Sequence, residues 1–163
     1  MLIRPAERAD VSALLEIYNR EVESSFATLD CKPKSHDDWE RWFFRHNIDN
    51  HPLIVAEIGR EIAGYISLSS FREKDGYSSS VELSVYVDER FRRLGVASAL
   101  MTEIISIARA DDRIHSIVSI IIDANVASHA LHEKFGFSYC GRVREAGYKF
   151  GKHVDIDYYQ FLV

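Results

Sequence analysis

Hydrophobic residues recur along this chain with two periods, about 3.6 residues in some segments and two residues in others. The helical period predicts helices that begin near residues 10 and 35, and further helices over 96–110 and 125–135. Alternation and short apolar runs predict strands over 2–4, 53–58, 62–69, 80–87, 114–122, 139–147 and 154–162. The run 114–122 is almost entirely apolar, so we expect a strand buried on both faces. This order predicts an α/β protein with a mixed sheet and helices on both faces.

Two of the predicted helices begin with residues that can cap them. Asp10 precedes apolar positions at helical spacing, and we expect its side chain to cap that helix. Ser35 is followed three residues later by Asp38, the arrangement of a capping box. Pro5 is expected to close the first strand.

The predicted strand over 80–87 has one apolar face and a second face made of Glu82, Ser84 and Tyr86. If helices cover both faces of the sheet, a glutamate on this strand implies a wet cleft or a bonded partner. The alternative is an edge strand whose polar face is exposed to solvent.

A loop of arginines and small residues follows this strand and leads into the helix over 96–110. Residues 92–97 read Arg-Arg-Leu-Gly-Val-Ala. Small residues let the backbone approach a ligand, and a helix start presents unpaired N–H groups and the positive end of its dipole. The loop is therefore a candidate anion site that suits a pyrophosphate. Arg92 and Arg93 add positive charge to a chain whose formal net charge is −5.

Composition narrows the class of protein further. A chain of 163 residues, 47% hydrophobic and 28% charged, suits a single globular domain over 1–163. Its acidic balance argues against general nucleic-acid binding, and its longest apolar stretch, 117–122, is too short to cross a bilayer. No secretory signal opens the chain, so we expect a cytoplasmic protein. Cys31 and Cys140 have no CxxC spacing and are expected to be free thiols.

Four short motifs now stand in a fixed order: Val-Tyr-Val at 85–87, R-x-x-G-x-A at 92–97, N-x-x-S at 125–128 and Gly-Phe at 136–137. Together they resemble the GNAT N-acetyltransferases. Segments 3–6, 17–19, 64–65, 82–87, 131–134 and 147–151 further resemble the phosphinothricin acetyltransferase-like branch. The resemblance covers essentially the whole chain and implies the GNAT fold, with a mixed, mostly antiparallel sheet of six to seven strands. Lys152 and His153 depart from the branch, which often carries an aromatic residue there, and this bears on the shape of the acceptor pocket.

The resemblance implies acetyl-CoA as cosubstrate. In this family the first loop cradles the CoA pyrophosphate, and the backbone of the preceding strand lies along the pantetheine arm. The residues implied in CoA binding are Leu83, Ser84, Val85, Tyr86, Val87, Arg92, Arg93, Leu94, Gly95, Val96, Ala97, Asn125, Ser128 and Lys134.

Two side chains are candidates for the chemistry itself. Glu82 could take the proton of an α-ammonium, directly or through water; the alternative is a solvated or salt-bridged glutamate. Backbone N–H groups near 83–85 could stabilise the oxyanion of the tetrahedral intermediate. His132 stands where many GNAT enzymes carry tyrosine, and an imidazole protonated near neutral pH could act as an acid or a proton relay. His129 precedes it at i, i+3, but no third ligand accompanies the pair, so we expect no metal site.

The resemblance also implies the acceptor. The branch acetylates the α-amino group of compounds such as phosphinothricin, methionine sulfoximine and methionine sulfone. Arg72 and Tyr77 lie in a loop that resembles its substrate loop, where an arginine suits a carboxylate; an ordinary surface loop is the alternative. Phe26 and Thr28 are implied as walls of the acceptor pocket, and a homodimer is implied as the assembly. Two other functions remain open, a peptide N-terminal acetyltransferase and a catalytically silent acyl-CoA-binding module.

Overall fold

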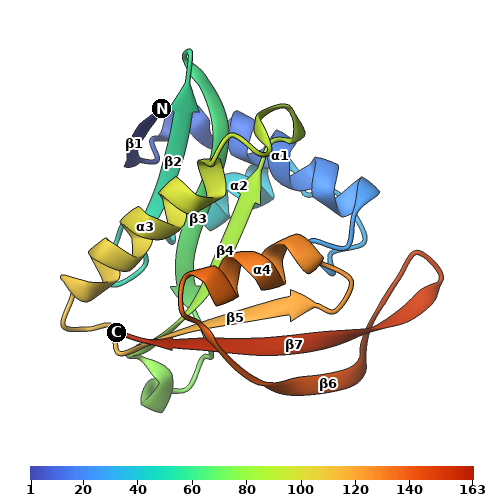
Figure 1. Ribbon diagram of the computed structural model, residues 1–163. Coiled ribbons are helices and arrows are strands. Elements are labelled where there is room, and N and C mark those ends of the chain that lie inside the picture. Colours follow the sequence, from blue (N-terminus) through green and yellow to red (C-terminus); the bar gives the residue numbers. More distant parts are fainter.

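Seven strands form one sheet in the order β1-β2-β3-β4-β5-β7-β6, in a computed structural model that describes residues 1–163 (Figure 1). The strands are β1 (Leu2–Pro5), β2 (Leu53–Ile58), β3 (Glu61–Ser70), β4 (Ser80–Val87), β5 (Ser116–Ile122), β6 (Ser138–Lys149) and β7 (Lys152–Leu162). The helices are α1 (Val11–Ser24), α2 (His36–Phe43), α3 (Val96–Arg109) and α4 (Val126–Lys134). There are also three short 3-10 helices, η1 (Arg8–Asp10), η2 (Asp75–Tyr77) and η3 (Glu89–Phe91). Only β4 and β5 are parallel, so the expectation of a mixed, mostly antiparallel sheet is confirmed.

Two hydrophobic clusters hold helices on opposite faces of the sheet. On one face, Leu14 and Ile17 of α1 and Trp39 of α2 are buried with Leu53 and Tyr65 of the sheet. On the other face α3 buries a stripe at helical spacing, formed by Val96, Leu100, Met101, Ile104, Ile105 and Ala108. Figure 1 shows α3 and α4 on the near side of the sheet and α1 and α2 on the far side.

One of the two predicted helix caps is confirmed and the other is wrong. The Ser35 hydroxyl accepts from the Asp38 N–H at 3.1 Å, and the Asp38 carboxylate accepts from the Ser35 N–H at 3.3 Å, which completes the capping box. Asp10 precedes α1 but makes no side-chain cap. Its carboxylate instead accepts from the Arg4 guanidinium at 2.7 and 2.9 Å and from the Glu7 N–H at 2.8 Å, because the 3-10 turn η1 directs it back toward β1.

Two further observations concern the cysteines and the lengths of the helices. Cys31 and Cys140 are both free, as expected from their spacing, and both are exposed. No helix in the structure has the length and apolar character needed to span a bilayer.

Strands β4 and β5 separate soon after they pair. Their parallel register covers only Ser80↔Ser116, Val81↔Ile117 and Glu82↔Val118, although β4 continues to Val87 and β5 to Ile122. Figure 1 shows the two strands diverging beyond this point. The backbone groups on the facing edges of the divergent parts have no strand partner, so they remain available to a ligand. The fold therefore opens a cleft in the middle of its sheet.

Candidate active site

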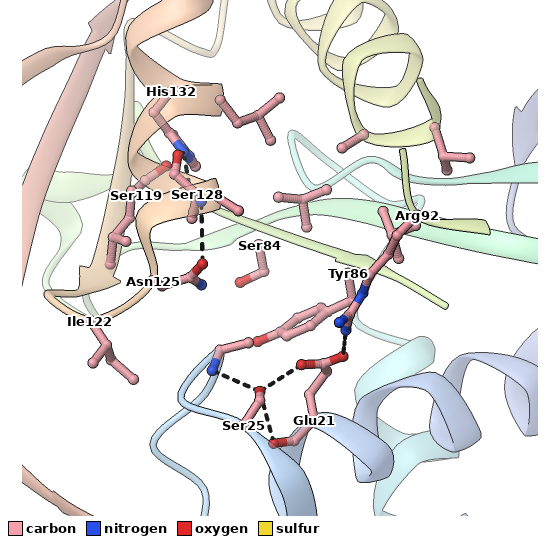
Figure 2. Close-up of a pocket in the computed structure, with 18 of the residues that line it drawn as sticks. Glu21, Ser25, Ser84, Tyr86, Arg92, Ser119, Ile122, Asn125, Ser128 and His132 are labelled. Carbon is pink, nitrogen blue, oxygen red and sulfur yellow. Dashed lines mark hydrogen bonds and ion pairs between the residues drawn. The ribbon is translucent and has the colours of Figure 1, made fainter. Parts of the chain in front are cut away.

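A cleft of about 780 Å³ lies between the divergent parts of β4 and β5. Its walls are residues 83–87 of β4, residues 119–122 of β5, the loop and first turn of α3, and the start of α4. Figure 2 shows Asn125, Ser128 and His132 of α4 on one side and Glu21, Ser25 and Arg92 on the other, with Ser84 and Tyr86 between them. Most of the residues expected to bind CoA thus lie around one cleft.

The loop before α3 holds a backbone shape that favours glycine. Gly95 has φ +81° and precedes the first helical residue, Val96, without any side-chain cap. A Cβ atom at Gly95 would meet nothing within 4 Å, which means that this stretch of backbone is open to a ligand. The N–H groups of the first turn of α3 are therefore free to meet an anion in the cleft. Leu94 is the exception in this loop, because it is 59% exposed and does not line the cleft.

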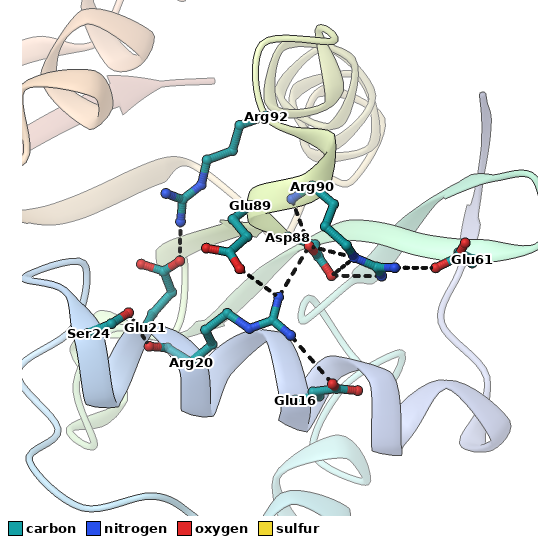
Figure 3. Close-up of polar contacts among 9 residues, drawn as sticks. All are labelled: Glu16, Arg20, Glu21, Ser24, Glu61, Asp88, Glu89, Arg90 and Arg92. Atoms are coloured by element: carbon teal, nitrogen blue, oxygen red, sulfur yellow. Dashed lines mark hydrogen bonds and ion pairs between the residues drawn. The ribbon is translucent and has the colours of Figure 1, made fainter.

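Arg92 is already paired with a carboxylate inside the cleft. Its guanidinium contacts Glu21 of α1, whose side chain is only 7% exposed, whereas Arg92 is 52% exposed. The other oxygen of Glu21 accepts from the Ser25 hydroxyl at 2.5 Å. Figures 2 and 3 show this pair bridging α1 and the loop. Arg92 is therefore not a fully free cation, although its half-exposed side chain also lines the cleft.

More ion pairs join α1 to the loop that follows β4 (Figure 3). Arg20 of α1 contacts Asp88 at 3.3 Å and Glu89 at 3.6 Å. Arg90 contacts the same Asp88 at 3.1 Å and Glu61 at 2.7 Å. Asp88 is buried, and Arg90 holds the pKa of its carboxyl below the ordinary value against the effect of desolvation. These contacts fix the loop on the side of the cleft that faces α1.

The start of α4 contributes the opposite wall. Asn125 is the N-cap of α4, and its side-chain oxygen accepts from the Ser128 N–H at 3.2 Å. Both residues line the cleft. Lys134 lies outside the lining, but its ammonium donates to the hydroxyl of Ser98, a lining residue, at 3.1 Å. Asn125 therefore caps α4 and lines the cleft at the same time.

Glu82 lies beside the cleft on β4, two residues from Ser84 on the same face. It is half-buried, and burial raises the pKa of its carboxyl, while the positive charge of Arg72 opposes that rise. A carboxylate with a raised pKa is better matched to a proton transfer near neutral pH. The structure thus gives Glu82 an environment suited to a base, although it does not line the cleft itself.

His132 differs from the expectation of an imidazole protonated near neutral pH. His132 is 2% exposed, and burial lowers the pKa of its imidazole. Its Nδ1–H donates to the Ser128 carbonyl at 2.8 Å, so the neutral ring carries its lone pair on Nε2, which has no hydrogen-bond partner. His132 lines the cleft and is equipped to accept a proton rather than to supply one.

The four residues expected to contact the acceptor do not form one group. Phe26 lines the cleft, whereas Thr28 is bonded to the Tyr18 hydroxyl at 3.0 Å. Arg72 and Tyr77 are exposed, and both contact Phe71: the guanidinium lies 4.2 Å from its ring and the Tyr77 ring lies edge-on at 5.8 Å. Arg72 remains close enough to Glu82 to affect its pKa.

A second cavity, of about 420 Å³, adjoins the cleft on the face covered by α1 and α2. Ser84 and Tyr86 line both spaces. The remaining walls are Tyr18, Asp30, Lys34, Asp38, Trp39, Trp42, Tyr65, Ser67 and Ser69. Ser69 pairs with Glu82 across the β3–β4 ladder, so the candidate base stands at the border of this cavity.

Sequence reasoning missed several residues of the site. Glu21 looked like one more residue of a helix, and Ser119 looked like part of a buried strand. Both line the cleft because distant elements meet there, and no local pattern marks such residues. Trp39 and Trp42 line the second cavity, and their helical spacing alone does not indicate that a cavity adjoins them.

The acetyltransferase (GNAT) domain family matches residues 3–157 of this chain. The chain belongs to this family and is an acetyltransferase. Phosphinothricin N-acetyltransferase of Streptomyces coelicolor is 34% identical over 161 residues, which cover 97% of this chain and 94% of that protein.

Solved structures of the same family are also similar. Ribosomal-protein-alanine N-acetyltransferase from Brucella melitensis superposes with a TM-score of 0.96 and 37% identity over the full length of both chains. The structure of Salmonella typhimurium yncA with its cofactor acetyl-CoA superposes with a TM-score of 0.94 and 31% identity, covering 99% of this chain and 92% of that one.

Proposed function

We propose that this protein transfers the acetyl group of acetyl-CoA to the α-amino group of a small amino-acid-like acceptor, of the phosphinothricin, methionine sulfoximine or methionine sulfone type. The observation that carries this function is the meeting of two cavities at one strand. The cleft and the second cavity share Ser84 and Tyr86, and Glu82 stands two residues further along the same face. A transferase needs such a meeting point between donor and acceptor.

Acetyl-CoA fits the cleft as donor. The Arg92–Ala97 loop and the first turn of α3 offer N–H groups to the pyrophosphate, and the unpaired edge of β4 offers hydrogen bonds to the pantetheine amides. The related structure of Salmonella typhimurium yncA holds acetyl-CoA as its cofactor. The thioester would then lie near Leu83 and Ser84, beside Glu82.

In the proposed reaction, Glu82 accepts a proton from the α-ammonium, directly or through water. The free amine attacks the thioester carbonyl carbon, and backbone N–H groups near 83–85 stabilise the oxyanion. Collapse of the intermediate breaks the C–S bond and releases the CoA thiolate, which leaves readily because the thiol has an ordinary pKa of about 8.5 and therefore needs at most a modest acid. The attacking nitrogen still carries one extra proton, which the neutral His132 can accept at Nε2 and pass to the CoA thiolate, so that an amide and a free thiol are formed.

The acceptor class draws support from the Streptomyces coelicolor relative, which is named for phosphinothricin. Arg72, near Glu82, carries the charge that would attract the α-carboxylate of such an acceptor. We further propose that the chain works as a homodimer, with the exposed β6 edge near the acceptor side.

A second candidate is acetylation of a protein N-terminus, because the Brucella melitensis structure is named a ribosomal-protein-alanine N-acetyltransferase. One experiment separates the candidates: thiol release from acetyl-CoA across amino acids, oxidised methionine analogues, polyamines and short peptides. Turnover with free amino acids supports the proposal, and turnover with peptides alone supports the second candidate. CoA binding without any turnover would indicate a silent binding module.

A further inference from the structure

A buried lysine joins the tip of the β6–β7 hairpin to the segment that follows α1. Lys149 is the last residue of β6 and is only 2% exposed. Its ammonium donates to the Thr28 carbonyl at 2.8 Å and to the Glu21 carbonyl at 3.4 Å. A buried charge in a protein is normally paired with an opposite charge, but the nearby carboxylates of Glu21 and Asp30 pair with other cations. The polar partners of this lysine are therefore backbone carbonyls.

These two carbonyls lie at the end of α1 and within the segment over residues 25–31. The last turn of α1 carries no basic side chain, although its carbonyls form the negative end of the helix dipole. Lys149 supplies a positive charge there from a distant strand. The Thr28 carbonyl accepts a hydrogen bond from Lys149 alone. Lys149 thus fixes the backbone at both ends of the connection between Glu21 and Thr28.

The hairpin tip contacts the 25–31 segment at further points. A Cβ atom at Gly147 would meet the two methyl carbons of Leu29 at 2.6 and 2.7 Å, so glycine permits this close approach. The ring of Phe26 lies edge-on to that of Phe150, with 5.2 Å between the centroids. The Lys152 ammonium lies 4.7 Å from the centroid of the Phe26 ring. The hairpin tip and the segment therefore pack against each other over several residues.

The 25–31 segment borders both cavities. Its residues 25–27 line the cleft, and Asp30 lines the second cavity. Tyr18, which also lines the second cavity, bonds through its hydroxyl to the Thr28 hydroxyl at 3.0 Å and donates to Asp30 at 2.5 Å. A displacement of the segment would change the place where donor and acceptor are proposed to meet.

We propose that Lys149 is a positioning residue for the acceptor, because it holds the 25–31 segment at the junction of the two cavities. By binding the Glu21 and Thr28 carbonyls it fixes the backbone that carries Phe26, a wall of the acceptor site. This inference rests on the proposed acetylation of an amino acid and adds a residue on which acceptor binding depends. Lys149 acts through the segment and takes no part in proton transfer.

Lys149→Met tests this role, because methionine nearly matches lysine in length but cannot donate to a carbonyl. In the thiol-release assay with a competent amino acid, KM for the acceptor should rise by roughly tenfold while kcat stays within about threefold. The CoA dissociation constant, measured by calorimetry, should change far less, because β4, β5, α4 and the loop before α3 form most of the cleft. The pH dependence of kcat should stay as in the wild type.

Gly147→Ala disturbs the segment at a different contact, since the new methyl group displaces Leu29. Acceptor KM should again rise, and adding Leu29→Ala should restore most of the loss, because it removes the two methyl carbons that collide. Lys32→Met is the matched control: Lys32 is an exposed lysine next to the segment and makes no hydrogen bond or ion pair. This variant should keep the acceptor KM of the wild type.

An unchanged acceptor KM in folded Lys149→Met would overturn the inference. Equal losses of acceptor and CoA binding would show a general structural role and overturn it too, as would a changed pH dependence of kcat, which would make Lys149 a proton-transfer group. If Lys149→Met does not fold, Gly147→Ala decides, and a missing rise or a missing rescue overturns the inference. Turnover of peptides alone by the wild type would instead overturn the amino-acid function on which the inference rests.

Discussion

Burial and a nearby cation act in opposite directions on the pKa of the Glu82 carboxyl. Burial raises the pKa of its carboxyl and Arg72 restrains the rise. We predict that Glu82→Gln lowers kcat by roughly 10²- to 10⁴-fold, because the amide cannot accept the ammonium proton. Calorimetry should find CoA affinity unchanged. The wild-type rate should fall as the pH falls through the raised pKa of Glu82, since only the ionised carboxylate is a base, and the variant should lack this limb. Near-normal turnover would remove Glu82 from the mechanism.

Arg72 is exposed, which limits what it can contribute to acceptor binding. Its guanidinium donates to the Phe71 carbonyl at 2.8 Å and to the Tyr158 hydroxyl at 3.5 Å. We predict that the wild type prefers a competent amino acid over its carboxamide by roughly tenfold in kcat/KM, a modest factor because solvent screens an exposed cation. Arg72→Ala should lose most of this preference. Equal rates for acid and amide in the wild type would favour peptide acceptors.

Arg92 pairs with Glu21 of α1, so substitution of Arg92 tests whether this arginine stabilises the fold, binds the ligand or does both. Arg92→Ala leaves the buried Glu21 carboxylate without its cation. We predict a loss of about 1–2 kcal/mol in the free energy of unfolding, reduced from the value of a fully buried pair because Arg92 is half exposed. Denaturant unfolding measures this loss. The CoA dissociation constant should also rise, by roughly tenfold for one lost phosphate contact.

The double variant Arg92→Ala with Glu21→Gln separates these two roles. Neutralising Glu21 removes the uncompensated charge, so the free energy of unfolding should recover while CoA affinity stays low. Recovery of both quantities would show that Arg92 acts on the cofactor site only through Glu21.

Buried His46 lies between the end of α2 and β3, and we expect it to make the stability of the fold depend on pH. The His46 Nδ1–H donates to the Trp42 carbonyl at 2.9 Å, and its Nε2 lies 2.8 Å from the Ser69 hydroxyl. Burial lowers the pKa of His46 to about 4, with His51 and Arg45 adding to the effect. The unfolded state therefore binds the proton first. The stability that His46 contributes is complete above its unfolded pKa of about 6.5 and is lost as the pH falls toward 4.

Denaturant unfolding at pH 7 and pH 5 measures this effect. We predict that the His46 term makes the wild type about 2 kcal/mol less stable at pH 5. His46→Gln, which keeps a polar side chain without titrating, should lose less over the same interval. An equal loss in both proteins would assign the pH dependence to other groups, among them His132.

Most helices and strands could be predicted from residues that are close together in the sequence. Features that depend on contacts between distant segments could not be predicted in this way. Ser35 and Asp38 marked a helix start correctly because both partners lie within four residues. The predicted helix cap at Asp10 is absent because Arg4, on β1, binds the Asp10 carboxylate instead. The 92–97 loop could be located from its glycine and arginines. The separation of β4 from β5 depends on how the two strands pair, which no local pattern indicates. The pairing of Arg92 with Glu21 joins residues that are 71 positions apart, so no local pattern indicates it either.

The outer edge of the sheet, strand β6, carries exposed apolar side chains on which we base a prediction of the assembly. β6 is the last strand of the sheet, and Figure 1 shows its hairpin with β7 extending away from the body. Tyr139, Val143 and Tyr148 on β6 are 56%, 48% and 59% exposed, an apolar content that is unusual for a free edge. A second copy packed there would bury these residues.

We therefore predict a homodimer that forms through β6, measured by sedimentation velocity at working concentration. Val143→Glu should shift the protein to monomer, because a charge buried in an apolar interface has no partner, and should raise the dimer dissociation constant by at least roughly a hundredfold. Ile48→Glu is the matched control: Ile48 is 53% exposed but lies beyond α2, so this substitution should leave the dimer intact. If the acceptor side lies near the interface, acceptor KM should rise in Val143→Glu while CoA affinity is preserved. A wild-type monomer with full activity would exclude the dimer as a requirement for acetyl transfer.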